Sequence, residues 1–388
     1  MLSDVDVVVV GAGPGGLYAA IEALKHGLSV KVFDKKSVVG CPVKCGEYFP
    51  VRKEMEYLLP SATNYMHVFD VPNECIDNVC KRIRVISPKG SEYEFEFAAY
   101  VLNRTILEQR LAREVEKLGG IIQLNTPVDL YAHNGVLLVG RDRANSVSAR
   151  TVIAADGFPS RVAKVAGILT DAYVTPNNVA INYEYLISEL EVDQQVTEMY
   201  LGTEFAPGGY GWIIPKGEHS ANVGIGIRTP YSRRNDGKGY LEFFVHNCQL
   251  TKQKLEGGKL STVIADVLPV DGPLDRTFSG GVLAVGDAAG MVMPTNGGGI
   301  ATAMITGTIA GQVAADHLQN GAPTSEYERR WKEAIGKEMV VSTRLRRLAD
   351  HFMGNDLAFH LLLKILGTHG IKDVITCRVP RFVHPLLP

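Results

Sequence analysis

The segment VDVVVVGAGPGG, residues 5–16, constrains the fold of this chain more than any other. Its first half is an apolar, β-branched run, which is typical of a strand buried on both faces of a parallel sheet. Gly11, Gly13 and Gly16 then form a G-x-G-x-x-G pattern, and a stretch with helical spacing follows and ends at Gly27. A strand, a glycine loop and a helix in this order predict the start of a dinucleotide-binding βαβ unit.

Each part of this unit has a physical role. Gly11 permits the tight turn, Gly13 lets the backbone approach a pyrophosphate, and Gly16 lets the helix pack on the strand, while the helix N-terminus offers unpaired N–H groups. Asp34 ends the next strand, 18 residues after Gly16 (34 − 16), close to the ~20 expected for a ribose-binding carboxylate. A tight turn without a ligand remains the alternative, and the agreement of strand, helix and acid disfavours it.

The rest of the chain alternates between helical and strand patterns. A helix is predicted in RTILEQRLAREVEKLGG, and buried strands in IIQLN, TVIAADG and GVLAVGDAAG. We therefore predict an α/β fold with a Rossmann-like dinucleotide-binding domain in discontinuous segments, an inserted β-rich substrate domain and a helical C-terminal region. The predicted division is 1–66, 98–172 and 271–320 for the dinucleotide-binding domain, 67–97 and 173–270 for the substrate domain, and 321–388 for the C-terminal region.

Composition and charge exclude several classes of protein. The net charge of −2 without a basic block argues against a nucleic-acid partner. There is no secretory leader pattern and no apolar run near the ~20 residues that span a bilayer, so we expect an intracellular, soluble protein, at most peripheral at the inner face of the cell membrane. The spacing of the six cysteines suits neither a disulfide scaffold nor a zinc ribbon, and no metal is expected.

Two later segments indicate which dinucleotide is bound. VIAADGFPSRVAKVAG contains Asp156 and Gly157, and GVLAVGDAAGMVMPTNGGGIATAM contains Asp287. With the glycine pattern, these segments resemble the FAD-dependent family that includes aromatic hydroxylases and geranylgeranyl reductases. The resemblance implies FAD, with Asp287 at the ribityl chain and Arg104 near the phosphates. An ordinary helix cap is the alternative role for Asp287.

A third segment resembles the substrate-domain signature of geranylgeranyl reductases. PGGYGWIIPKGEHSANVGIGI, residues 207–227, matches Tyr-x-Trp-x-Phe-Pro, with Ile214 in place of the phenylalanine. A period of two places Tyr210, Trp212 and Ile214 on one face of a strand. On the returning strand Gly224 and Gly226 would leave a bare face that a long or flat ligand can approach. An aromatic stripe that is simply core is the alternative.

The segment CPVKCGEYFP, residues 41–50, completes the resemblance. Archaeal reductases of this family carry a Pro-x-x-Cys-Gly segment whose cysteine lies beside the flavin ring, and Cys45 with Gly46 matches it. A neutral thiol there could donate a hydrogen bond or a proton, or merely shape the pocket. A Cys41–Cys45 disulfide stays open, and Cys41 has no role in the pattern.

These resemblances imply an FAD-dependent reductase that saturates C=C bonds of geranylgeranyl chains in archaeal-type ether lipids, with hydride from flavin N5. Cys45 is the candidate proton donor, and a flavin-bound water is its rival. The candidate cofactor-binding residues are Gly11, Gly13, Pro14, Gly15, Gly16, Asp34, Lys35, Cys45, Gly46, Tyr48, Arg104, Val128, Asp156, Gly157, Asp287, Gly298, Gly299 and Ile300. The candidate substrate-binding residues are Tyr210, Trp212, Ile214 and Gly224.

Partners and alternatives follow from the same reasoning. The expected partners are a geranylgeranylated lipid and an external electron donor, for which ferredoxin, reduced deazaflavin and NAD(P)H stay open. Residues 357–366, LAFHLLLKIL, are a candidate membrane contact, although a buried helix is favoured. The alternative functions are a flavin-dependent monooxygenase or halogenase of the same fold, and a flavin redox sensor or prenyl-lipid carrier without turnover.

Overall fold

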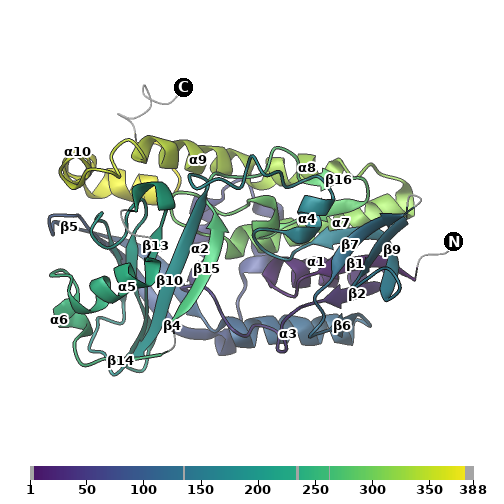
Figure 1. Ribbon diagram of the computed structural model, residues 1–388, viewed down its shortest axis with the longest axis horizontal. Helices are drawn as coiled ribbons and strands as arrows, with labels where there is room; N and C mark the ends of the chain where they lie inside the picture. Colours follow the sequence, from purple (N-terminus) through teal and green to yellow (C-terminus); the bar gives the residue numbers. More distant parts are fainter. Residues whose placement is uncertain (1–3, 134–135, 233–235, 262, 381–388) are drawn as a thin grey trace.

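Two sheets organise the chain (Figure 1). The computed structural model describes residues 4–133, 136–232, 236–261 and 263–380. In the first sheet the parallel strands lie in the order β17, β9, β1, β2, β6, and β16 and the β7–β8 hairpin extend it with antiparallel pairs. Its strands are β1 (Val5–Val10), β2 (Val30–Phe33), β6 (Ile121–Gln123), β7 (Asp129–His133), β8 (Val136–Gly140), β9 (Ser146–Ala154), β16 (Phe278–Ser279) and β17 (Val282–Ala284).

Two helices of this half of the molecule pack backbone against backbone. The glycine loop leads into α1 (Pro14–Lys25), which lies against α7 (Ile300–Asn320) and α3 (Arg104–Lys117). A Cβ atom on Gly307 of α7 would lie only 2.1 Å from the carbonyl oxygen of Gly15, so glycine is required at this crossing. The close approach fixes the starts of α1 and α7 relative to each other.

The second sheet has the strand order β14, β10, β13, β12, β11, β4, β5, β3, with β15 also paired to β10. One face packs on α5 (Gly237–His246) and α6 (Lys252–Leu255) through a core that includes Ile213 and Phe244, and the opposite face carries Trp212 and Ile214. This alternation confirms the predicted period of two. The strands are β3 (Tyr48–Pro50), β4 (Ile76–Ile86), β5 (Glu92–Leu102), β10 (Val179–Ser188), β11 (Val196–Tyr200), β12 (Gly211–Gly217), β13 (Ser220–Ile227), β14 (Lys259–Leu260) and β15 (Ile264–Pro269).

The second sheet differs from the sequence-based expectation in two respects. Within residues 173–270, predicted to be β-rich, α5 and α6 also occur, because the buried side chains of α5 recur at helical spacing. In addition β3, and β5 as far as Leu102, pair within this sheet, although 1–66 and 98–172 were assigned to the FAD-binding part. The long antiparallel pairing of β4 with β5 therefore extends the second sheet past the expected domain boundary at residue 98.

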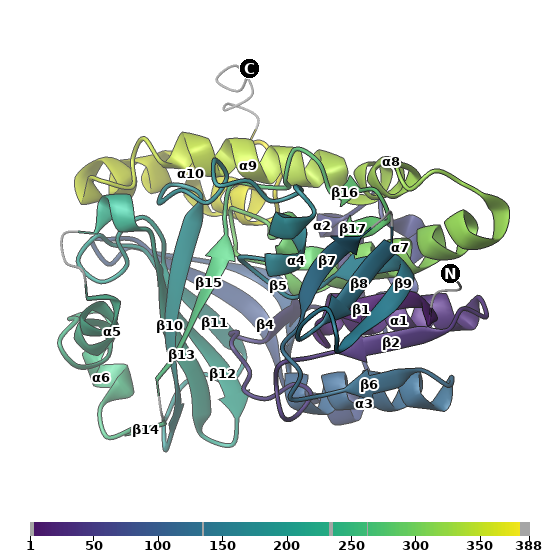
Figure 2. The same cartoon turned by 45° about the vertical axis from the view of Figure 1, so that its right-hand side comes forward.

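Helices of the C-terminal region lie along one edge of the molecule, the upper edge in Figure 2. They are α8 (Glu326–Trp331), α9 (Lys337–Ala349) and α10 (Asp356–Ile375), and the shorter α2 (Arg52–Leu58) and α4 (Arg161–Val165) come earlier in the chain. Within the described residues, no helix is both long and apolar enough to cross a bilayer. The last part of the predicted C-terminal region, 381–388, lies outside the described residues.

Candidate active site

A cavity of about 570 Å³ lies where the glycine loop, the start of α7 and the Trp212 face of the second sheet converge. Two predicted site residues, Gly16 and Gly224, are not among the residues that line it. All the other predicted site residues line this cavity: Gly11, Gly13, Pro14, Gly15, Asp34, Lys35, Cys45, Gly46, Tyr48, Arg104, Val128, Asp156, Gly157, Tyr210, Trp212, Ile214, Asp287, Gly298, Gly299 and Ile300. Residues that lie far apart in the sequence, from Gly11 to Ile300, are thus brought to one place.

Two helix N-termini open into this cavity without a side-chain cap. Gly13 is the N-cap residue of α1 and Gly299 that of α7, and neither helix has a side-chain hydrogen bond to its first turn. A Cβ atom on Gly13 would meet nothing within 4 Å, so its backbone is open to the cavity. A Cβ atom on Gly16 would lie 1.9 Å from the carbonyl oxygen of Gly11, which gives Gly16 a packing role away from the cavity. Unpaired N–H groups and helix dipoles at both ends favour an anionic ligand.

The three predicted carboxylates differ in their surroundings. Asp34 accepts hydrogen bonds from the N–H groups of Ala12 (2.7 Å) and Lys36 (2.8 Å), which ties the strand end to the glycine loop. Asp156 accepts the hydroxyl of Ser160 (2.5 Å) and N–H groups at the start of α4, so it anchors that helix. Burial raises the pKa of Asp287 to about 6, and α7 begins after Gly299 without using it as a cap.

Arg104, predicted to lie near the phosphates, lines the cavity at the start of α3. Its guanidinium pairs with Glu108 one turn along α3, and its side chain also lies within interaction distance of the Cys45 thiol. The backbone N–H of Arg104 donates to the carboxylate of Glu47 (2.9 Å). The arginine therefore connects α3 to the cysteine loop as well as lining the cavity.

Cys45 is a free, half-buried thiol that lines the cavity, and Cys41 is a free, exposed one. The structure therefore contains no Cys41–Cys45 disulfide. The Cys45 Sγ accepts a hydrogen bond from the Glu47 N–H (3.2 Å). Burial raises the pKa of the Cys45 thiol, and the nearby Arg104 guanidinium partly opposes this effect. The thiol is therefore protonated at neutral pH and can act as a proton donor.

A buried polar network that the sequence analysis did not identify holds the cysteine loop on the second sheet. The Trp212 indole N–H donates to the side-chain oxygen of Asn222 (2.6 Å), whose amide donates to the carbonyl of Cys45 (3.5 Å). The buried carboxylate of Glu184 on β10 lies next to Asn222 and the Cys45 backbone, and burial raises the pKa of Glu184 to about 7. These contacts join residues up to 177 positions apart, which no local spacing signals.

The loop also has ionic anchors to the second sheet. Glu47, which is buried, pairs with Lys216 on β12, and Lys216 in turn contacts Asp77 (3.0 Å). Lys44 pairs with Asp266 on β15 (3.3 Å). The thiol of Cys45 is therefore positioned from both sides of its loop.

The substrate-domain signature forms one wall of the cavity. Tyr210 donates from its hydroxyl to the carbonyl of Asn296 (2.6 Å), in the loop before α7, and its ring lies edge-on to Trp212 with centroids 6.0 Å apart. The prediction that Gly224 presents a bare face to a ligand is wrong, because the Trp212 indole covers it: a Cβ atom on Gly224 would lie 2.3 Å from that ring. Gly226, two residues further along β13, does line the cavity.

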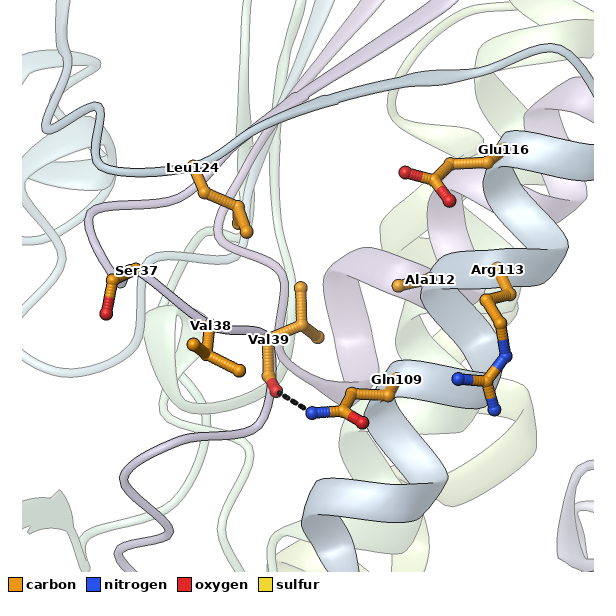
Figure 3. Close-up of a pocket in the computed structure, with 8 residues that line it drawn as sticks. All are labelled: Ser37, Val38, Val39, Gln109, Ala112, Arg113, Glu116 and Leu124. Carbon is orange, nitrogen blue, oxygen red and sulfur yellow. Dashed lines mark hydrogen bonds between the residues drawn. The ribbon is translucent and has the colours of Figure 1, made fainter.

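A second, smaller hollow of about 270 Å³ lies between residues 37–39 and α3 (Figure 3). Gln109 spans it by donating to the carbonyl of Val39 (3.5 Å). None of its lining residues borders the large cavity, and none is a predicted site residue. Over the described part of the chain, no group of three or more His, Cys, Asp or Glu side chains is arranged to hold a metal ion.

Comparisons with known proteins agree with this geometry. Residues 178–265 match the geranylgeranyl reductase catalytic domain, and residues 9–82 match an NAD(P)-binding Rossmann-like domain. The digeranylgeranylglycerophospholipid reductase of Methanothrix thermoacetophila is 33% identical over 367 residues, covering 91% of this chain and 89% of that protein. The reductase of the same name from Methanocaldococcus jannaschii is 34% identical over 369 residues, covering 92% and 90%.

The chain belongs to the digeranylgeranylglycerophospholipid reductase family. It is an FAD-dependent oxidoreductase, and the resemblance drawn from its motifs is confirmed. A geranylgeranyl bacteriochlorophyll reductase-like protein from Thermoplasma acidophilum has the same fold, with a TM-score of 0.83 and 28% identity over 98% of each chain. A flavin-dependent brominase has a TM-score of 0.70 and 16% identity over 97% of this chain and 94% of its own, which shows a shared fold only.

Proposed function

We propose that this enzyme saturates C=C bonds in the geranylgeranyl chains of archaeal-type ether phospholipids. The observation that carries the proposal is that Cys45 and the wall of Tyr210, Trp212 and Ile214 line the same cavity as the glycine loop and the start of α7. A proton donor, an apolar wall and two uncapped helix N-termini therefore meet in one space. The archaeal relatives named digeranylgeranylglycerophospholipid reductases support the choice of substrate.

The cavity has the features that FAD requires. The N-termini of α1 and α7 supply N–H groups and positive dipole, the first suited to a pyrophosphate and the second to an electron-rich reduced ring. Asp34 lies at the end of β2, where the ribose-binding carboxylate of such folds is found. We assign the cofactor to Gly11, Gly13, Pro14, Gly15, Asp34, Lys35, Gly46, Tyr48, Arg104, Val128, Asp156, Gly157, Asp287, Gly298, Gly299 and Ile300, which all line the cavity.

Reduced FAD, when bound, supplies the hydride that adds to one alkene carbon. Cys45 supplies the proton for the other carbon: its S–H bond breaks as the new C–H bond forms, and the thiolate left behind regains a proton from solvent. The Arg104 guanidinium and the Glu47 N–H stabilise that thiolate. An isolated alkene has no oxygen for an oxyanion hole, so the remaining catalysis is alignment of the chain against the Tyr210–Trp212 wall.

The enzyme also needs an electron donor for its flavin and access to a membrane lipid. The absence of a second G-x-G-x-x-G in the sequence favours an external donor over an internal NADPH domain, with ferredoxin, reduced deazaflavin and NAD(P)H as the candidates. Because the substrate is a membrane lipid, the enzyme attaches peripherally to a membrane surface.

Product analysis tests the proposal. The protein with FAD, dithionite and digeranylgeranylglycerophospholipid should, without oxygen, yield lipid whose mass rises by two hydrogens for each double bond reduced. A product that forms only when oxygen and halide are added would instead support the halogenase alternative. Bound FAD and bound lipid with no new product under either condition would support the carrier or sensor.

A further inference from the structure

The first half of α10 has an apolar face exposed to solvent, although the sequence analysis favoured a buried helix there. Phe359 and Leu363 pack into the core, whereas Leu357, Leu361 and Ile365 on the other side are 58%, 49% and 70% exposed. These three side chains follow an i, i+4, i+8 spacing, so they form one stripe about 12 Å long. An exposed stripe of large aliphatic side chains marks an interaction surface.

The charge around this stripe indicates what covers it. Residues 321–388 contain eleven lysines and arginines against seven aspartates and glutamates, which leaves +4 in a chain whose net charge is −2. Lys364 is exposed beside Ile365, and α9 along the same edge of the molecule exposes Lys337, Val340 and Arg344 (Figure 2). Aliphatic side chains interspersed with lysines and arginines match a surface of anionic lipid headgroups over acyl chains.

The helix that carries the stripe is also next to the cavity. Met353, three residues before α10, lines the cavity. Ile375 also lines it, but it lies in the second half of α10, beyond a kink at Gly367. On its inner side the helix is fixed by His360, whose ring nitrogen lies 3.0 Å from the Ser87 hydroxyl, and by Asp356, which accepts from Thr203 (2.9 Å). The stripe therefore faces outward on the first segment of α10, and the chain before this segment reaches the cavity.

We propose that the stripe of Leu357, Leu361 and Ile365 docks this enzyme on an anionic bilayer. The partner is a lipid surface with negatively charged headgroups, and the part of this inference that concerns substrate delivery rests on the proposed function. Docking places the cavity beside the bilayer from which a prenyl chain is drawn.

Vesicle flotation tests the proposal. The protein loaded with FAD should float with vesicles of equal parts phosphatidylglycerol and phosphatidylcholine, and at least tenfold less with phosphatidylcholine alone. The double variant Leu361→Glu, Ile365→Glu should bind the anionic vesicles at least tenfold more weakly. Ile121→Glu is the matched control: Ile121 is 58% exposed on β6, at the opposite edge of the molecule (Figure 2), and its replacement should leave binding unchanged.

Two further results separate this proposal from others. The double variant should keep its FAD and its turnover of detergent-dispersed lipid, with the loss confined to lipid in vesicles. Unchanged vesicle binding by the double variant would overturn the proposal, as would a wild-type dimer in gel filtration that the double variant dissociates. If wild-type protein binds vesicles but reduces no lipid in either form, the proposed function fails and the docking surface stands.

Discussion

The contact between α1 and α7 gives the most quantitative prediction, made with Gly307→Ala. The new Cβ atom would lie 2.1 Å from the carbonyl oxygen of Gly15, and ordinary contact begins at 3.4 Å, so the helices must separate by about 1.3 Å. Alanine gains about 1 kcal/mol over glycine inside a helix, whereas forced overpacking costs about 1–3 kcal/mol. Because the clash is with backbone, we expect the larger overpacking cost, which lowers the free energy of unfolding by about 2 kcal/mol net.

The same displacement should weaken FAD binding, because it moves one helix N-terminus relative to the other. Charge-assisted hydrogen bonds contribute about 1.5–3 kcal/mol each, and the loss of one corresponds to at least a tenfold rise in Kd. Urea unfolding of the apoprotein and fluorescence titration with FAD measure the two effects. Gly354→Ala is the control, since a Cβ atom there meets nothing within 4 Å. A Gly307→Ala protein as stable as wild type, with unchanged FAD affinity, would refute the reasoning.

Three further predictions concern the cysteine loop. Cys45→Ser should keep FAD and lower kcat at least a hundredfold, as expected for loss of a general acid. The control Cys41→Ser should leave kcat unchanged. Full turnover by Cys45→Ser would rule out the thiol as proton donor. Lys216→Met should lower the free energy of unfolding in urea by about 3–5 kcal/mol, because the buried Glu47 carboxylate loses its partner. Adding Glu47→Gln to this variant should restore much of the lost stability. Burial raises the pKa of Glu184 from 4.5 to about 7, so the folded state binds its proton more tightly and wild-type stability should fall by roughly 3 kcal/mol as pH rises from below 4.5 to above 7. Glu184→Gln should remove that fall in stability. Identical dependence of the unfolding free energy on pH in wild type and Glu184→Gln would contradict the prediction.

The cofactor side of the site was predictable because its signals are local. Gly11, Gly13 and Asp34 are set by a tight turn, a helix start and a strand end within about 25 residues, and the start of α7 follows the same logic at Gly299. Parallel strands bring such turns to one edge of a sheet, so the lining of one cavity follows from chain pattern and topology.

The substrate side was less predictable because it depends on pairing across the second sheet. The period of two correctly placed Trp212, but the covering of Gly224 by its ring depends on the register of β12 with β13 and on a side-chain rotamer. Glu184 and Asn222 looked like ordinary strand residues, and only the fold brings them to Cys45. For residues 357–366 a buried helix was favoured over a membrane contact, because large aliphatic side chains occur on both its inner and its outer side and only the fold shows which are exposed.

A single anaerobic turnover followed by flavin absorbance is the most direct test of the proposed reaction. The enzyme with its FAD reduced by one equivalent of dithionite is mixed with digeranylgeranylglycerophospholipid in the absence of oxygen. The flavin should reoxidise at a rate that rises with lipid concentration, and it should do so at least a hundredfold more slowly in Cys45→Ser. Flavin that stays reduced with the lipid present, and reoxidises only when oxygen is admitted, would contradict the account.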